Sequence, residues 1–92
     1  MKFGDRVNIV GVLKRRNPRA NYKEWRRFCD LHENCIFLGY RTLSNGNIEY
    51  CHEEGYHYYP DEYFQAALVC INERRKPVYV LLGDVELVGA GN

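Results

Sequence analysis

Residues 35–50 read CIFLGYRTLSNGNIEY, and this stretch decides the fold class. Apolar, aromatic or β-branched side chains occupy every second position from 36 to 42, which is the period of a β-strand. Ser44-Asn45-Gly46 follows, and Asn-Gly is the pair favoured in the tight turn of a β-hairpin. With a return strand at 47–50, the sequence predicts a hairpin here and a mainly β chain.

Strands are also expected on both sides of this hairpin. Residues 6–13 are rich in β-branched side chains, which indicates a strand that Asn17-Pro18 would end, because proline cannot donate to a β-ladder. Residues 64–72 also fit a helix capped by Asp61, but the loop-like run before VYVLL favours a strand at 67–71. The remaining expected strands are 56–59, ended by Pro60, then 78–82 and 85–88.

Residues 21–33 admit two interpretations. Asn21 can cap a helix whose capping box is completed by Glu24, and apolar or aromatic side chains recur at spacings of three and four. The alternative is a long irregular loop pinned by Trp25 and Phe28. Both remain open, so the segment is expected as a long insertion, helical or irregular, after the first strand.

The length of 92 residues limits the chain to one domain, 1–92, because two hydrophobic cores would each be too small to fold unaided. Five or six short strands separated by turn residues predict a small antiparallel barrel or sandwich. No stretch approaches the roughly 20 apolar residues of a membrane span, and the first residues lack the apolar core of a signal peptide. We therefore expect a cytoplasmic protein with no membrane partner.

The charge is balanced in total but divided along the chain. There are 13 basic and 12 acidic side chains, for a formal net charge of +1. Residues 1–27 carry nine basic and two acidic side chains, whereas residues 28–72 carry one basic and seven acidic side chains. The total argues against a nucleic-acid binder that relies on bulk charge, and the division leaves a locally basic segment beside an acidic one.

The four cysteines are too few for a disulfide scaffold, and a reducing cytoplasm would keep them as thiols. Three of them lie near histidines, and the residues concerned are of types that bind zinc: Cys29, His32, Cys35 and Cys51. Their spacings match no zinc ribbon or finger. Either a structural zinc or free thiols fits the sequence, and no cofactor is predicted.

Candidate catalytic groups are few: His52 beside Glu53 and Glu54, or a cysteine near His32 or His57. The chain has no Gly-rich phosphate loop, no nucleophile elbow and no recognised metal signature. The sequence therefore predicts that the protein is not an enzyme, with His52 and its neighbours in a solvated turn.

Both ends of the chain resemble SH3-like barrel domains. Gly4-Asp5-Arg6-Val7 opens the first strand after a Gly-Asp turn, and Pro77-Val78-Tyr79-Val80 precedes Gly83-Asp84-Val85-Glu86-Leu87. In that family the last two strands are separated by one helical turn. The resemblance implies a small SH3-like barrel. The chain departs from the family at 14–35 and 51–64, which are longer than the usual connections.

The stretch 37–46, with Tyr59-Pro60 and the closing segment 75–80, is also similar to small uncharacterised proteins of bacteriophages. Phage genes of this size frequently encode stoichiometric inhibitors of host machinery, including anti-CRISPR and other anti-defence proteins. The resemblance implies a protein that works in the cytoplasm of an infected bacterium and binds a host defence effector.

Two binding functions fit the residues themselves. Segment 14–28 interleaves basic and aromatic side chains, a pattern that suits the phosphates and bases of nucleic acid, although Trp25 fits a core position better. Oppositely charged segments, one of them rich in tyrosine, suit protein interfaces and also permit a homodimer. We expect protein binding first and nucleic-acid binding second. The alternative to a tyrosine interface is that about half of these tyrosines pack inward at alternate strand positions. The expected contact residues are Arg15, Arg16, Arg19, Tyr22, Lys23, Arg26, Arg27, Tyr56, Tyr58 and Tyr59.

Overall fold

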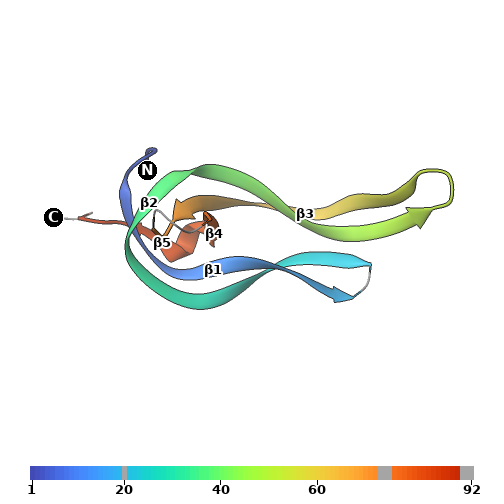
Figure 1. Ribbon diagram of the computed structural model, residues 1–92, viewed down its shortest axis with the longest axis horizontal. Helices are drawn as coiled ribbons and strands as arrows, with labels where there is room; N and C mark the ends of the chain where they lie inside the picture. Colours follow the sequence, from blue (N-terminus) through green and yellow to red (C-terminus); the bar gives the residue numbers. More distant parts are fainter. Residues whose placement is uncertain (20, 73–75, 90–92) are drawn as a thin grey trace.

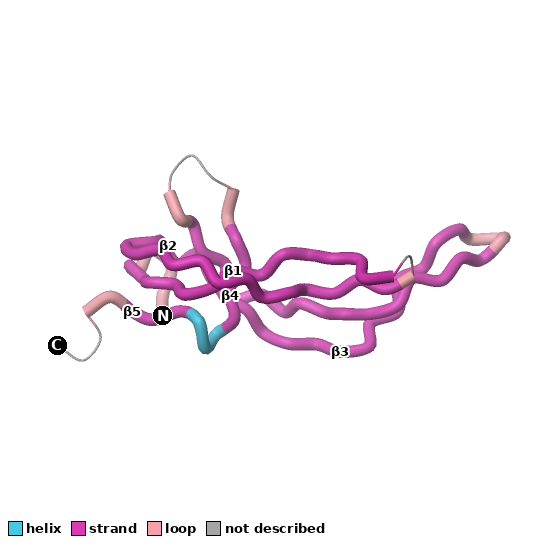
Figure 2. The backbone as a smooth tube through the Cα atoms, turned by 90° about the horizontal axis from the view of Figure 1, so that it is seen from below, coloured by secondary structure: helices cyan, strands magenta, loops and turns pink. Residues whose placement is uncertain are grey.

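The computed structural model describes residues 1–19, 21–72 and 76–89, with the side chains of all of these except 17–19. The chain is mainly β, as predicted, and its strands pair antiparallel. They are β1 (Arg6–Arg19), β2 (Tyr22–Cys51), β3 (Gly55–Cys70), β4 (Val78–Leu81) and β5 (Val85–Leu87). Within the described ranges the only helix is a 3-10 turn, η1 (Leu82–Asp84), drawn cyan in Figure 2. No helix in this part of the chain is long and apolar enough to cross a membrane.

The strands form one sheet in the order β2-β3-β4-β1-β5, and β2 also pairs with β1. The pairings β1–β2, β2–β3, β3–β4 and β4–β1 therefore run in a closed cycle at the base of the molecule. Two long hairpins leave this base in the same direction, while the N-terminus and β5 lie at the base (Figure 1). We call β1 14–19 with β2 22–27 the first arm, and β2 44–51 with β3 55–63 the second arm. The arms make the molecule elongated, with extents of 57 × 25 × 22 Å.

The core consists of two clusters. The larger is built from Val7, Ile9, Val12, Cys35, Phe37, Ala67, Val69 and Val80. The smaller is built from Leu13, Leu43 and Ala66, with Trp25, Phe64, Tyr79 and Leu81 packed against it. Chain neighbours such as Ala66 and Ala67 enter different clusters because successive side chains of a strand point to opposite faces. Along β1, Val7 and Ile9 share the larger cluster with Val12 of the other parity, because the register shifts between Ile9 and Gly11.

The expectation of a helical or irregular insertion at 21–33 is wrong. These residues belong to β2 and pair with β1, with Arg15 opposite Trp25 and Val12 opposite Phe28. The spacing of three between Trp25 and Phe28 places them on opposite faces of the strand, where Phe28 packs on the larger cluster and Trp25 on the smaller. Both aromatic side chains are therefore held by a β-ladder, which overrides the helical spacing.

Two predicted strand ends are also wrong, because the structure tolerates proline at irregular positions. β1 passes Asn17-Pro18 and ends at Arg19, with a register shift between Arg16 and Arg19. β3 likewise continues through Pro60, beside the register shift on β2. Proline is accepted within a sheet at bulges and edges, where its missing N–H removes no ladder bond. The expected short strands therefore merge into fewer, longer ones.

The expected turn at Asn45-Gly46 is wrong as well. Asn45 and Gly46 lie inside β2 opposite Glu62 and Pro60, and the register shifts between them. The hairpin closes instead beyond the pair Cys51 and Gly55, where Gly55 has φ +81. Gly46 is needed for a close approach of two strands, since a Cβ there would lie within 3 Å of the backbone of Tyr59 and Pro60. Gly46 therefore lets β2 and β3 stay paired across a bulge.

The C-terminal predictions are confirmed. The strand expected at 67–71 is the end of β3, so the helical alternative for 64–72 is excluded. The strands expected at 78–82 and 85–88 are β4 and β5, and η1 is the helical turn expected between them. These short elements close the base from which both arms extend.

Candidate functional site

An open cleft of about 350 Å³ lies between the two arms where they leave the base. Its lining comes from the four paired strands: Leu13, Trp25, Arg27, Asn45, Glu62, Phe64, Gln65 and Leu81. Leu81 is the last residue of β4, so the cleft begins where that strand ends. The lining combines an apolar floor with a few polar groups, the composition typical of a binding site.

The apolar floor is built by the smaller core cluster. Trp25 packs edge to face on Tyr79, with ring centroids 5.1 Å apart. The guanidinium of Arg15 lies over the Trp25 ring, 5.6 Å from its centroid. Trp25 is therefore a half-buried wall of the cleft and a core side chain together, as the sequence favoured.

Two hydrogen bonds fix the distance between the arms. The backbone N–H of Trp25 donates to Oδ1 of Asn45 over 2.8 Å. Nearer the tips, the N–H of Ile48 donates to the carbonyl oxygen of Asn21 over 2.7 Å. Asn45 also donates from Nδ2 to Glu62 over 3.2 Å. These hydrogen bonds hold the cleft in shape, because they join the start of β2 and Asn21 before it to the end of β2, and the end of β2 to β3.

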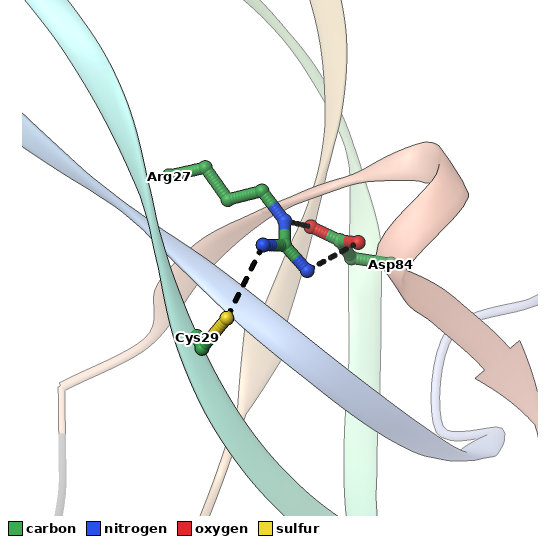
Figure 3. Close-up of polar contacts among 3 residues, drawn as sticks. All are labelled: Arg27, Cys29 and Asp84. Atoms are coloured by element: carbon green, nitrogen blue, oxygen red, sulfur yellow. Dashed lines mark hydrogen bonds and ion pairs between the residues drawn. The ribbon is translucent and has the colours of Figure 1, made fainter.

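Arg27 ties the first arm to the C-terminal turn (Figure 3). Its Nε and Nη2 donate to Oδ2 and Oδ1 of Asp84 over 2.5 and 3.1 Å, and Nη1 donates to Sγ of Cys29 over 3.5 Å. The hydrogen bonds to Asp84 and then to Cys29 raise the pKa of Arg27 above its ordinary value. The sequence predicts Arg27 as a partner-binding residue, but in the structure all three guanidinium nitrogens donate hydrogen bonds within the chain.

The remaining expected cations of the first arm are mostly exposed. Lys14 and Arg16 share one face, where both cations lie over the ring of Phe28 at 5.4 and 5.2 Å from its centroid. Arg26 is exposed and pairs with Glu24 over 3.1 Å. Exposed ion pairs of this kind contribute little to stability. This face therefore presents positive charge to solvent with its aromatic ring already covered.

The end of the first arm lies against the acidic second arm. Burial, together with the carboxylates of Asp61 and Glu62, raises the pKa of Tyr22. Lys23 is half-buried next to it. The side chain of Arg19 lies outside the described residues. The basic and acidic segments thus meet here, while Lys14, Arg15 and Arg16 stay exposed along β1.

The tyrosines of the second arm are mostly exposed, so the alternative in which about half of them pack inward is wrong. Tyr58 is half-buried, and its hydroxyl lies 3.0 Å from Oγ of Ser44. Tyr56 and Tyr59 are 77% and 51% exposed. Tyr56 faces Tyr50 across the hairpin, with ring centroids 5.0 Å apart, beside a shallow hollow near the tip of the first arm. Of the three expected contact tyrosines, two are therefore free to meet a partner.

The four residues considered for zinc are not brought together. Within 1–19, 21–72 and 76–89, no group of three or more His, Cys, Asp or Glu side chains could hold a metal ion. Cys35 is buried, and burial raises the pKa of its thiol, which favours the protonated form that does not bind zinc. Cys51 lies near the end of the second arm, and His32 pairs with Asp30 over 2.8 Å.

No family model, curated protein or solved structure matches this chain. The site is therefore interpreted from its own residues.

Sequence reasoning found Trp25 and Arg27 but missed the other residues that line the cleft and the residue that supports it. Phe64 and Asn45 line the cleft from different strands, and Asp84 holds Arg27 from η1. The Asn-Gly pair predicts a turn at Asn45, because this pair occurs both in tight turns and at bulges and the local sequence does not separate the two. The signal that could have placed Asn45 in the cleft is its position opposite Glu62, but this position follows only from the strand register.

Proposed function

We propose that this chain is a non-enzymatic binding protein that acts by stoichiometric protein–protein interaction. The observation that carries the proposal is the aromatic surface of the second arm, which we define as Tyr50, Tyr56, Tyr59 and Tyr63. These side chains are 60%, 77%, 51% and 67% exposed, and none belongs to either core cluster. Tyrosine gives large apolar contact area at low entropic cost, and it is enriched in interfaces and their hot spots.

Both faces of the second arm carry this surface. Tyr50 and Tyr56 pack against each other on one face with their ring planes tilted by 58°, and the His52 ring lies 5.6 Å from that of Tyr50. Tyr59 lies beside His57 at 6.3 Å and occupies the other parity of β3. An arm that is aromatic on both faces suits insertion between parts of a partner.

The identity of the partner and the fold family rest on the resemblances. The closed cycle of pairings and the turn η1 before β5 support a small SH3-like barrel at the base. The similarity to phage proteins supports a host defence protein, such as a CRISPR-Cas component, as the partner in the cytoplasm of an infected bacterium. The arms then correspond to the segments 14–35 and 51–64 in which the chain departs from the barrel family.

Nucleic-acid binding is the second candidate, because Lys14, Arg15 and Arg16 are exposed in a row on β1. Such cations neutralise phosphates and release counterions. However, base stacking needs free ring faces, and the rings of Trp25 and Phe28 are already covered by protein side chains. The nearby carboxylates of the second arm would also repel phosphate. Protein binding is therefore favoured.

The test is affinity capture from a bacterial lysate with quantitative mass spectrometry. Wild type is compared with Tyr50→Ser/Tyr56→Ser and with the matched control Phe3→Ser, since Phe3 is as exposed as Tyr56 at 77% but lies at the base. We expect one dominant protein at a 1:1 ratio, reduced at least tenfold in the tyrosine variant and retained in the control. Repeated recovery of no protein that depends on Tyr50 and Tyr56 would refute the proposal.

A further inference from the structure

The second arm is longer than the first. The two arms are joined at Ile48, whose N–H donates to the carbonyl oxygen of Asn21 in the turn of the first arm over 2.7 Å. Beyond this link β2 runs on to Cys51 and β3 begins at Gly55, so the second hairpin closes further out. Both views show its end reaching past the end of the first arm (Figures 1 and 2). We call residues 49–56 the projecting end of the second arm.

The projecting end is acidic and exposed. Its carboxylates are those of Glu49, Glu53 and Glu54, it contains no Lys or Arg, and every side chain in it is exposed. Among the described residues, the only ion pair that reaches these carboxylates joins Nε2 of His57 to Glu54 over 2.9 Å. Like charges repel one another and build up a local potential where no cation offsets them. The projecting end therefore favours a partner surface of positive charge.

Two tyrosine rings accompany the carboxylates. Tyr50 and Tyr56 wall the shallow hollow where the projecting end leaves the first arm. Their ring planes are tilted by 58° and their centroids are 5.0 Å apart, so the two rings form one aromatic surface. The rest of the hollow is lined by Asn21, Ile48 and Glu49. The described lining thus contains one acidic residue and no Lys or Arg.

Arginine is the side chain that suits this combination of groups. Its planar guanidinium packs on an aromatic face and donates paired hydrogen bonds to a carboxylate, whereas the lysine ammonium acts as a point charge. The chain itself contains such packing in the first arm, where the guanidinium of Arg15 lies over the Trp25 ring, 5.6 Å from its centroid. Exposed rings and carboxylates on one hairpin therefore favour a partner surface that is rich in arginine.

We infer that the projecting end enters an arginine-lined groove of the partner protein. Arginine side chains of the groove pack on the rings of Tyr50 and Tyr56 and pair with the carboxylates. Glu49 and Tyr50 point to opposite faces of β2, so a groove that encloses the hairpin meets both. This inference rests on the proposed protein-binding function, for which it supplies the chemistry of the partner surface.

A second copy of this chain is a poorer partner for the projecting end. The chain carries a formal net charge of only +1. Its basic first arm is also bonded to its own acidic second arm through Asn21 and Ile48. A copy that brought its cations to the projecting end would bring its own carboxylates with them, which weakens the attraction. A different protein with a basic groove is therefore favoured.

The test titrates the isotope-labelled full-length chain with three synthetic peptides and follows binding by NMR. In the peptides, glycine alternates with arginine, with lysine or with glutamate. We expect the arginine peptide to bind with chemical-shift changes at 49–56, the lysine peptide to bind about threefold more weakly, and the glutamate peptide not to bind.

Two variants and one control then locate the contact. Glu49→Gln/Glu53→Gln and, separately, Tyr50→Ser/Tyr56→Ser should each weaken binding of the arginine peptide about fivefold. Glu33→Gln/Glu86→Gln is the matched control, because it removes the same charge from exposed residues at the base. Its affinity should stay within about twofold of wild type, since salt screens charges at that distance.

Four results would overturn the inference: no binding of the arginine peptide, shift changes confined to residues outside 49–56, equal affinity in wild type and Glu49→Gln/Glu53→Gln, or sedimentation of the chain alone as a dimer that this variant dissociates. Capture from a lysate separates the inference from the proposed function. If capture depends on Tyr50 and Tyr56 but is unchanged in Glu49→Gln/Glu53→Gln, only the arginine-lined groove is refuted. If the arginine peptide binds as expected and no protein is captured, the proposed function fails and the surface chemistry stands.

Discussion

Gly46→Ala should lower the free energy of unfolding by about 3 kcal/mol, the upper end of the range for overpacking. A Cβ at residue 46 would lie 2.3 Å from the carbonyl oxygen of Tyr59 and 2.9 Å from the Cα of Pro60. An ordinary contact begins at 3.4 Å, so β2 and β3 would have to separate by about 1 Å. Because the obstructing atoms are backbone, no change of side-chain rotamer can relieve the clash.

Gly83→Ala is the matched control. A Cβ at residue 83 would have no heavy atom within 4 Å. Gly83 lies in η1, where alanine is intrinsically favoured over glycine, so the free energy of unfolding should stay within about 0.5 kcal/mol of wild type. The two variants make the same chemical change, and they differ only in what surrounds the added methyl group.

Urea unfolding followed by tryptophan fluorescence measures both variants. For a slope of about 1 kcal/mol per molar urea, Gly46→Ala should lower the midpoint by about 3 M and Gly83→Ala should move it by less than about 0.5 M. If Gly46 instead sat in an exposed hairpin turn, the loss would be only about 1 kcal/mol. A Gly46→Ala midpoint within about 1 M of wild type would therefore refute the bulge.

Three further predictions concern the polar contacts. Asn45→Ala should lower the free energy of unfolding by about 1 to 2 kcal/mol in urea, because the part-buried N–H of Trp25 loses its acceptor, and an unchanged midpoint would contradict the link. Arg27→Lys and Asp84→Asn should each lower the melting temperature measured by calorimetry, because each breaks the same contact. The double variant should lose less than the sum of the two decreases, and an additive decrease would contradict a shared contact. The fold raises the pKa of Tyr22 above 10, so the neutral hydroxyl stabilises the folded state below pH 10 and this stabilisation is lost as the pH rises further. Between pH 8 and 11, the free energy of unfolding should therefore fall less in Tyr22→Phe than in wild type, and an equal fall in both would contradict the raised pKa.

The C-terminal strands could be predicted because their signals are local. Val78, Tyr79 and Val80 are β-branched or aromatic, and Gly83-Asp84 marks the turn after Leu81 and Leu82. Asn45-Gly46 misled because glycine is required equally by a tight turn and by a close approach of strands. Only the position of Tyr59 opposite Gly46 separates the two cases, and that position depends on register.

The candidate site was predictable by residue type and not by arrangement. Arg15 and Tyr56 could be predicted as contact residues from their types, and both are exposed in the structure because the arms have no core to bury them. The cleft was not predictable, because Trp25, Phe64 and Leu81 come from three different strands. Likewise, the commitment of Arg27 to Asp84 joins residues far apart in the chain, which no local pattern reveals.

The membership of β2 in both hairpins has a consequence for how the chain folds. The β1–β2 ladder can start at the pair Arg19 and Tyr22, and the β2–β3 ladder at the pair Cys51 and Gly55, so each zips from a nearby turn. Closure of the base is different, because it joins Leu13 to Tyr79 and Val7 to Leu87 across most of the chain. Contacts between such distant positions form slowly, since loop-closure entropy must be overcome first. We therefore expect the two arms to form early and the docking of β4 and β5 to limit the folding rate.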